Sequence, residues 1–532
     1  MTFTAGNFLL LAAIILIFSI LLSKTGYRFG VPTLLIFLLA GMFFGEDGFG
    51  IHFDNYNTAQ FIGMIALSII LFTGGMDTKF EAIKPVLAPG IVLATAGVLL
   101  TTVFTGFFIY GVGVVFEKAI DIPLTIALLL AATMSSTDSA SVFSIIRSQK
   151  MKMRNNLQPL LELESGSNDP MANMLTIVMI QVIQNGSGGN VSVIEIITTF
   201  LWQFGMGVVF GYGFGRIYVL VHNALRLENK SLYQILIIGF IFLTFSISNL
   251  VGANGYLAVY IAGIIVGNAG MVKQDIKITV FNKEFSFFGH RKIIERRSID
   301  KLLDGLTWLV QIVMFLMLGL LVTPHSMLPI AVPAISIAVF VILIGRPAAV
   351  FLCLLPFRKI GLKDKTFISW VGLRGAAPII FATYPFVAGI EGGQFIFNVV
   401  FFITLISLIV QGTTIPFFAK KLKLGEKDES GPQNFGIEIP EELNAIMDEQ
   451  TVDNEAYLKD YPLPKGTLVM IVKRGERYII PNGKLYLKKG DKLLLISESR
   501  EEEIIENIEN HNDGKIKLNW NFNFDLLNKK NK

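Results

Sequence analysis

The sequence predicts an all-α polytopic membrane protein followed by a small α/β domain. Of its 532 residues, 52% are hydrophobic and only 16% are charged, and the mean hydropathy is +0.59. Soluble globular domains contain about 25% charged residues. The shortage of charge is confined to residues 1–420, where apolar runs alternate with short polar breaks, whereas residues 421–532 have an ordinary soluble composition. We therefore expect one large membrane domain with a small domain after it.

The apolar runs have the length of membrane-spanning helices. A transmembrane helix needs about 20 predominantly apolar residues, and by this measure the sequence contains about 13 candidates. They lie near residues 7–23, 31–46, 59–76, 85–112, 122–147, 158–184, 193–223, 232–250, 255–270, 303–322, 328–356, 366–389 and 395–419.

Basic residues gather in alternate loops between these segments. Lys24 and Arg28 follow the first segment, and Lys420, Lys421 and Lys423 follow the last one. Cytoplasmic loops of membrane proteins carry the excess of Lys and Arg. The alternation therefore predicts a protein of the cell inner membrane, with the N-terminus outside and the C-terminal domain in the cytoplasm.

Several classes of protein are disfavoured by what the sequence lacks. The net charge of +4 is modest and comes from loops beside the membrane, so no nucleic-acid partner is expected. Cys353 is the only cysteine, so no intrachain disulfide can form. The sequence contains neither the Gly-x4-Gly-Lys-Ser/Thr pattern of an ATP-driven pump nor the His-Glu-x-x-His pattern of a zinc enzyme. We therefore expect a secondary transporter that is not an enzyme.

The fifth segment carries an aspartate in the middle of a predicted span. Asp138 lies in the string Ala-Thr-Met-Ser-Ser-Thr-Asp-Ser-Ala-Ser-Val, which is poor helix interior because Ser, Thr and Asp side chains compete for backbone hydrogen bonds. Thr137 or Asp138 is instead a good N-cap for a second half-helix. A helix broken at this depth exposes backbone groups that can form an ion site. The alternative is a kink in which Asp138 makes only a structural hydrogen bond.

The sixth segment carries a second group of polar residues, in Leu-Glu-Leu-Glu-Ser-Gly-Ser-Asn-Asp-Pro. At about 100° per residue, Ser165 and Asp169 share one helix face, and Glu164 and Asn168 share the next. We expect Asp169 to be the group that exchanges a proton for a cation, because partial desolvation makes the two ions compete for one carboxylate. Glu162 is expected at a wet entrance. Polar helix packing alone accounts for Ser165 and Asn168 but not for two acids.

Two arginines in later segments can compensate these acids. Arg346 stands in Ile-Gly-Arg-Pro-Ala, and Arg374 stands in Trp-Val-Gly-Leu-Arg-Gly-Ala-Ala-Pro. A buried arginine requires a carboxylate, and we assign Arg346 to Glu164 as a structural ion pair. Arg374 is expected to support a break in the twelfth segment. Asp77, near the end of the third segment, is expected to lie at a solvated helix end.

The fifth and twelfth segments are seven apart, so the chain crosses the membrane in opposite directions at the two expected breaks. This arrangement favours inverted repeats of about six helices each, built around an ion site near the membrane midplane.

These strings identify a family resemblance. The stretches at residues 136–140, 164–172, 303–312, 345–347 and 369–379 resemble bacterial monovalent cation:proton antiporters of the sodium/proton exchanger superfamily, especially the potassium/proton antiporters implicated in cell-volume regulation. The resemblance covers nearly the whole membrane region.

The resemblance implies both an architecture and a site. It implies a homodimer with a moving core that works by elevator-like alternating access. The exchange is of a monovalent cation for H+, with K+ as the expected cation and Na+ as the alternative. It implies ion ligation around Thr137, Asp138, Ser165 and Asp169, and it implies that an asparagine at Asn168 accompanies electroneutral exchange. The same resemblance implies that Glu164 is bridged to Arg346. The chain departs from the common family pattern at Ser139, where many members have proline.

The C-terminal region is expected to be a regulatory domain. Residues 467–497 alternate apolar and polar residues and predict short strands, residues 499–510 predict a closing helix, and residues 421–434 predict a polar linker. Residues 435–510 resemble the C-terminal half of a regulator-of-potassium-conductance (RCK, TrkA-C) domain, and 511–532 read as a tail. Such domains can bind small nucleotides, but the sequence has no Gly-rich dinucleotide motif and no cofactor is expected.

The main rival is a potassium channel or uptake protein gated by such a domain. A channel filter requires convergent carbonyls from a string of the Thr-Val-Gly-Tyr-Gly type. The nearest string, Gly211-Tyr212-Gly213-Phe214-Gly215, lies inside the long seventh segment and favours close helix packing instead.

Overall fold

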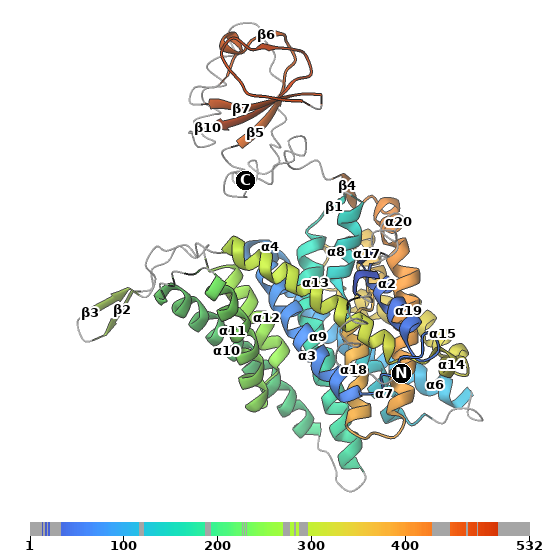
Figure 1. Cartoon of the computed structure of the whole chain (residues 1–532). Helices are drawn as coiled ribbons and strands as arrows, with labels where there is room; N and C mark the ends of the chain where they lie inside the picture. The colour runs from blue at the N-terminus through green and yellow to red at the C-terminus, as the bar shows by residue number, and fades with distance from the viewer. Residues whose placement is uncertain are drawn as a thin grey trace. The chain divides into compact units, whose positions relative to one another are not determined.

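The computed structural model describes the chain as two units, residues Met1–Lys427 and Asp428–Lys532 (Figure 1). The residues described are 13, 16–18, 20–21, 33–115, 122–149, 151–186, 193–225, 227, 229, 231–269, 277–280, 283–286, 296–427, 447–463, 467–475 and 477–497. Each unit is considered by itself.

The first unit is built almost entirely of helices. Within the described residues, seven helices are long and apolar enough to cross a membrane, and four shorter apolar helices accompany them. The first predicted segment, near 7–23, lies largely outside the described residues, so the count of about 13 stays a prediction.

The unbroken helices follow the predicted spans closely. They are α2 (Thr33–Phe44), α3 (Tyr56–Asp77), α9 (Leu157–Gly186), α10 (Val193–Ala224), α11 (Ser231–Leu250), α12 (Gly255–Gly267) and α13 (Arg296–Leu320). A hairpin of β2 (Lys277–Val280) and β3 (Lys283–Ser286) precedes α13, and the short α14 (Pro324–Met327) follows it.

Three further helical stretches contain a π-helical turn. The first runs through α4 (Phe80–Ile83), the 3₁₀ turn Lys84–Val86, α5 (Leu87–Val92), the π turn Leu93–Gly97 and α6 (Val98–Val115). The second joins α15 (Ala331–Phe340) to α16 (Arg346–Cys353) through Val341–Gly345, and the third joins α19 (Gly393–Ser407) to α20 (Thr413–Lys421) through Leu408–Gly412. Such turns are frequent near functional sites, and Arg346 directly follows one of them.

Two helices are interrupted near the middle of the unit. The fifth predicted segment divides into α7 (Leu124–Thr133) and α8 (Ser139–Ser148), and the twelfth divides into α17 (Leu362–Trp370) and α18 (Ala376–Val387). Both interruptions fall at the polar strings that predicted them. The non-helical residues are 135–138 in the first interruption and 372–375 in the second.

Glycines bring the helices into backbone contact. A Cβ atom at Gly41 would lie 2.9 Å from the Gly319 Cα, so α2 and α13 cross at these two glycines. In the same way Gly75 of α3 meets Gly263 of α12. A Cβ atom added at either of these glycines would lie 3.2 Å from the Cα atom of the other. Without a hydrophobic driving force between helices in lipid, small residues that permit close approach stabilise the contact.

The glycine-rich string of α10 serves the same purpose. A Cβ at Gly211 would lie 3.0 Å from the Ala258 Cα, and a Cβ at Gly215 would lie 3.2 Å from the Ala262 Cα. This helix face therefore packs on α12, as predicted, and does not form an ion filter.

We predict that Gly75→Ala destabilises the protein and that Gly74→Ala does not. The added methyl at Gly75 collides with the backbone of α12, whereas nothing lies within 4 Å of a Cβ at Gly74. Overpacking of this kind costs about 1–3 kcal/mol. Thermal unfolding of the two detergent-purified variants makes the comparison, and equal midpoints would contradict the close α3–α12 crossing.

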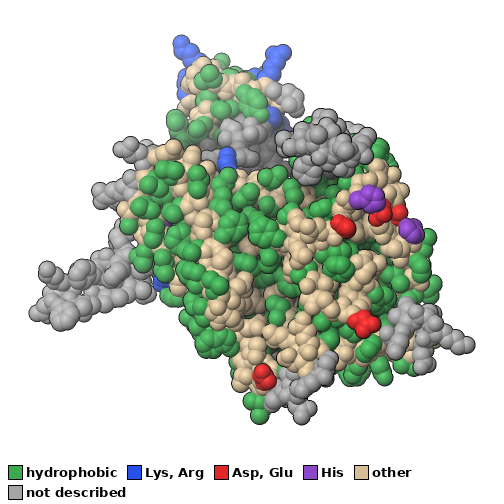
Figure 2. All heavy atoms as spheres, turned by 60° about the horizontal axis from the view of Figure 1, so that its bottom comes forward, with side chains coloured by type: hydrophobic (Ala, Val, Ile, Leu, Met, Phe, Trp, Pro, Cys, Tyr) green, Lys and Arg blue, Asp and Glu red, His purple; other side chains and the backbone are tan. Residues whose placement is uncertain are grey.

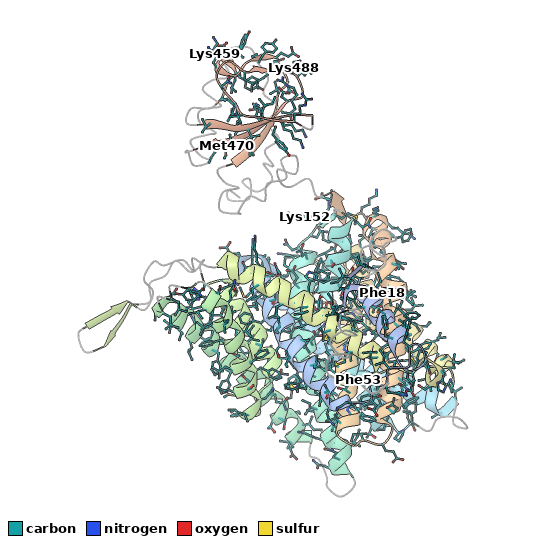
Figure 3. All side chains as sticks on the ribbon, viewed as in Figure 1. Phe18, Phe53, Lys152, Lys459, Met470 and Lys488 are labelled. Carbon is teal, nitrogen blue, oxygen red and sulfur yellow. The ribbon has the colours of Figure 1, made fainter. Side chains whose placement is uncertain are left out.

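The two ends of the membrane unit differ in charge. On the face shown in Figure 2, hydrophobic side chains predominate and the charged side chains of the membrane unit are mainly Asp, Glu and His. Glu46 pairs with His52 at 3.3 Å, and Asp47 accepts hydrogen bonds from His325 N and Nδ1 at 2.8 and 3.2 Å. Hydrogen bonds from His325 hold the pKa of Asp47 below its usual value. Lys152 lies at the other end of the unit (Figure 3).

A small ribbon lies beside the start of the predicted linker. Strand β1 (Met151–Met153) pairs antiparallel with β4 (Gly425–Lys427). Arg154 N donates to Leu424 O at 3.0 Å, and its guanidinium forms an ion pair with Glu426. The predicted linker at 421–434 therefore begins with ordered structure, because a loop next to α9 supplies a strand partner that no local pattern reveals.

The described part of the second unit consists mainly of strands. The strands β5 (Met447–Thr451), β10 (Lys492–Ser497), β7 (Thr467–Arg474) and β8 (Arg477–Ile479) form one antiparallel sheet in that order, and β6 (Ala456–Tyr457) pairs with β9 (Tyr486–Leu487). Its core contains Val452, Val469, Val472, Leu487, Leu493 and Leu495. The strands predicted within 467–497 are confirmed, whereas the predicted helix at 499–510 and the tail at 511–532 lie outside the described residues.

One ion pair organises the turns of this sheet. Asp491 is 2% exposed and accepts from Arg474 Nε at 2.9 Å, from Arg474 Nη2 at 2.6 Å and from Lys488 N at 2.9 Å. Burial raises the pKa of Asp491, but these hydrogen bonds outweigh it, so the pKa is lowered overall. Lys459 and Lys488 lie on the surface of the unit (Figure 3).

Candidate functional site

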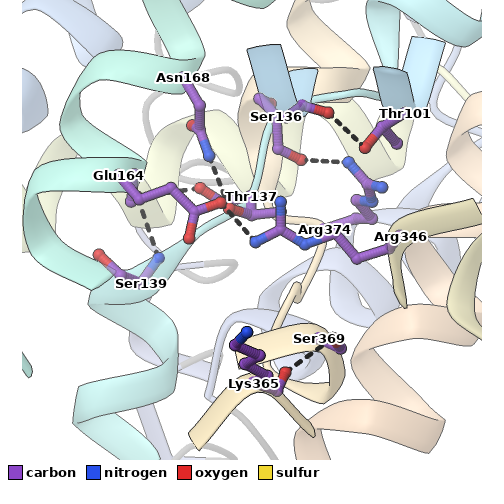
Figure 4. A network of polar contacts seen from close by, with 12 residues as sticks. Thr101, Ser136, Thr137, Ser139, Glu164, Asn168, Arg346, Lys365, Ser369 and Arg374 are labelled. Atoms are coloured by element: carbon purple, nitrogen blue, oxygen red, sulfur yellow. Dashed lines mark hydrogen bonds and ion pairs between the residues drawn. The ribbon is translucent and has the colours of Figure 1, made fainter. Parts of the chain in front are cut away.

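The two interrupted helices cross at their breaks (Figure 4). Asp138 N donates to Leu373 O at 2.8 Å, and Arg374 Nη1 donates to Ser136 O at 2.6 Å. Backbone groups that lose their helical partners must be satisfied elsewhere when they are buried. Each break therefore supplies part of the hydrogen bonding that the other one requires.

Asp138 caps the second half of its helix. Its Oδ1 accepts from Ser141 N at 3.0 Å, and its Oδ2 accepts from the Ser141 hydroxyl at 2.5 Å. This is the N-cap geometry that the sequence predicted for Thr137 or Asp138, and the structure assigns it to Asp138. The carboxylate thus has a fixed orientation.

Helix α9 lies against the first break and contacts it through two polar side chains. Ser165 Oγ accepts from Ser139 N at 3.1 Å and donates to Thr137 O at 2.9 Å. Asn168 Nδ2 donates to Thr137 Oγ1 at 2.6 Å, and Asn168 is completely buried. The structure therefore brings Thr137, Ser165 and Asn168 together as one connected group.

Asp169 and Asp138 line one small cavity of about 40 Å³. Ser136 and Thr137 contribute the remaining polar atoms of the first break, and the other wall residues are mainly apolar: Leu34, Leu67, Ile70, Gln311, Met314, Phe315, Gly375, Ala376, Ala377 and Pro378. A site for one water needs about 10–15 Å³ by this measure, so a single dehydrated ion with a water or two fits.

Two acceptor atoms near the cavity remain available to a ligand. Among the described residues, Ser136 Oγ and Asn168 Oδ1 are buried and have no partner within normal hydrogen-bond geometry, although the Ser136 side chain is close enough to Asp169 to interact with it. Buried oxygen atoms without partners are costly. Ser136 lines the cavity, so its hydroxyl can meet a cation or a water held there, whereas Asn168 is not a lining residue.

Glu164 and Arg346 form a buried ion pair beside this group. Arg346 Nη2 donates to Glu164 Oε1, and the two side chains are 3% and 1% exposed, respectively. Neither residue lines the small cavity. The pairing assigned from the sequence is thus the one present, and it neutralises a charge without occupying the ion cavity.

Arg374 supports the break through hydrogen bonds to a backbone carbonyl and a hydroxyl group. It is 1% exposed, its Nη1 binds Ser136 O, and its backbone N donates to Ser407 Oγ at 3.0 Å. Ser407 in turn donates to Gln411, whose Nε2 donates to Trp370 O at 2.7 Å. These contacts agree with the supporting role expected of Arg374.

Sequence reasoning missed three contributors to the site. Gly375 allows Asp138 to approach, because a Cβ there would lie 2.7 Å from the Asp138 Cβ. Ser141 orients the carboxylate, and Leu373 supplies the carbonyl that binds Asp138 N. The glycine following Arg374 was the available signal. The Leu373 carbonyl has no sequence signal, since every residue has a backbone carbonyl.

We predict that Arg346→Gln strongly destabilises the fold, because Glu164 is left buried without its counter-charge. Breaking one partner of a buried pair costs about 3–5 kcal/mol, whereas replacing both partners costs far less. Glu164→Gln combined with Arg346→Gln is therefore expected to recover most of the loss. Thermal unfolding in detergent gives the comparison, and a double variant as unstable as Arg346→Gln alone would contradict this account.

The architecture and the site together define a class of protein. Interrupted helices that meet around carboxylates within a membrane bundle are how secondary transporters build cation sites. The comparisons with known proteins agree. Residues 11–421 match the family described as "Sodium/hydrogen exchanger, transmembrane", and the chain belongs to this family. It is an exchanger of monovalent cations for protons and not an enzyme.

Its relatives carry more specific names. The chain is 37% identical to "K(+)/H(+) antiporter NhaP2" of Shewanella oneidensis over 511 residues, which are 94% of this chain and 83% of that protein. It is 38% identical to "K(+)/H(+) antiporter NhaP" of Alkalimonas amylolytica over 480 residues, 90% of this chain and 76% of that protein.

A solved structure shares the fold. The sodium proton antiporter MjNhaP1 from Methanocaldococcus jannaschii at pH 8 superposes with a TM-score of 0.62 and 22% identity, covering 77% of this chain and 97% of that chain. The resemblance of the membrane region to the sodium/proton exchanger superfamily is confirmed. The ion-binding roles of individual residues stay predictions.

Proposed function

We propose that this protein exchanges K+ for H+ across the cell inner membrane and that Asp169 carries the exchanged proton or faces the cation. The observation that carries this proposal is the shared cavity of about 40 Å³, which two carboxylates from different helices line. We propose K+ and not Na+ as the substrate because relatives with 37% and 38% identity are named K(+)/H(+) antiporters.

The two carboxylates have different surroundings. Ser141 holds Asp138 by two hydrogen bonds, so we assign Asp138 as a fixed ligand together with Thr137 and Ser165. Asp169 lies on α9 next to Pro170, where the helix lacks one backbone N–H. A carboxylate in a nearly dry cavity is stable with a proton or with a cation beside it, but not empty. One ion therefore displaces the other.

This competition supports electroneutral exchange. Asn168 is uncharged and is bound to Thr137, so it adds no further titrating group. With Asp169 as the only group that changes partner, one cation replaces one proton. A homodimer with elevator-like alternating access follows from the family resemblance and is part of the proposal.

The orientation and the C-terminal unit complete the proposal. The basic loops support an external N-terminus and a cytoplasmic C-terminal unit. The resemblance of residues 435–510 supports an RCK-like regulatory domain, for which a small nucleotide is the proposed ligand, and the described part of this region contains an antiparallel sheet. A gated channel, the rival function, is not favoured by relatives that are named antiporters.

We predict that Asp169→Asn abolishes cation-dependent proton movement while the protein stays folded. The amide has nearly the same shape but cannot exchange a proton for a cation. Reconstituted vesicles with an internal pH dye and external K+ give the measurement. Glu195→Gln, at an exposed position in the first turn of α10, is the matched control and retains wild-type rates.

Two outcomes bear directly on the proposal. Wild-type exchange by Asp169→Asn would remove this residue from its role. Proton flux that changes when the membrane potential is clamped would contradict one-for-one exchange.

A further inference from the structure

A second, larger cavity adjoins the ion cavity. Its volume is about 490 Å³, and it reaches from the exposed Asp304 on α13 to the first two turns of α8. Three residues, Leu34, Ile70 and Gln311, line both this outer cavity and the small inner one. These three residues form the junction between the two cavities.

The outer cavity has a polar wall on α13. Asp304, Thr307 and Gln311 stand three and four residues apart, so they lie on one helix face. Thr307 Oγ1 donates to Thr73 Oγ1 of α3 at 3.2 Å, which places a second polar group opposite. The α13 face thus offers oxygen atoms in steps from the exposed rim to the junction.

The outer cavity also reaches the site from another side. Ser141 lines it and donates its hydroxyl to Asp138 Oδ2. One serine therefore faces the outer cavity and holds a carboxylate of the inner one. Ser141 therefore links the two cavities on the α8 side, as Leu34, Ile70 and Gln311 do at the junction.

Gln311 differs from its two neighbours at the junction. Leu34 and Ile70 are apolar, so Gln311 is the one polar side chain among the three residues shared by these two cavities. A cation that moves from about 490 Å³ to about 40 Å³ must lose most of its water there. The side-chain carbonyl of glutamine can replace a water oxygen in the ion's shell, as carbonyls do in ion filters.

We propose that Gln311 is a specificity-determining residue: its side-chain carbonyl takes over part of the hydration shell of the cation at the junction. This inference rests on the proposed exchange and adds a residue to it. Alkali ions differ in size and in the cost of losing water, so one oxygen ligand at this point affects them unequally. Gln311 therefore sets the apparent affinity and the preference among ions, while Asp169 performs the exchange.

The test compares variants of Gln311 in reconstituted vesicles. Gln311→Met removes the carbonyl at similar length, and Gln311→Asn keeps the carbonyl but withdraws it by one methylene. Gln203→Leu is the matched control, because Gln203 lies half-buried in α10 and lines neither cavity. Proton exchange is measured against the concentrations of K+, Na+, Rb+ and Li+.

For Gln311→Met we expect the half-saturating K+ concentration to rise about 10–100-fold. This is the effect of losing one hydrogen-bond-like contact between the Gln311 carbonyl and a charge. The maximal rate at saturating K+ stays within about twofold of wild type, because the lost contact weakens binding of the ion without changing the Asp169 carboxylate that performs the exchange. The K+/Na+ affinity ratio changes in both variants, and it stays constant in Gln203→Leu.

An unchanged affinity ratio in both Gln311 variants overturns the inference, and so does an equal loss for all four ions. If Gln311→Met fails to fold, the Gln311→Asn ratio alone decides. A failure of the proposed function looks different: there Asp169→Asn retains exchange whatever the Gln311 variants do.

Discussion

The crossing of two interrupted helices is the constraint on which the rest of the membrane unit depends. A break within a bilayer is tolerated only if its freed backbone groups find partners inside the protein. Here Asp138 N binds Leu373 O, and Arg374 binds Ser136 O, so neither break is stable without the other. The small cavity of the proposed ion site is lined by residues of both segments.

The charges around the crossing are distributed so that one carboxylate remains available. Arg346 neutralises Glu164 away from the cavity, Arg374 is directed to a carbonyl, and Ser141 fixes Asp138. Close helix crossings at Gly41–Gly319 and Gly75–Gly263 keep the surrounding helices rigid. In the proposed exchange, Asp169 is the group whose partner changes.

Much of this could be predicted from the sequence, because a charge or a polar string inside an apolar span is informative by itself. Asp138, Asp169 and the breaks were found in this way. Charge balance called for an arginine partner of Glu164, and the family resemblance pointed to Arg346. The contacts of Leu373 and Gln311 could not be predicted, since they depend on which helices meet in space, whereas Gly375 carried a signal in its place directly after Arg374. The β1–β4 ribbon was missed for the same reason: Met151–Met153 carries no strand pattern of its own.

The most direct test of the central claim counts protons during cation binding. Purified protein in weakly buffered detergent solution is titrated with KCl while the released protons are measured with a pH dye. Competition for one carboxylate predicts one proton released per K+ bound, with the yield falling to zero once Asp169 is already ionised at high pH. Binding of K+ with no proton release at any pH would contradict the account.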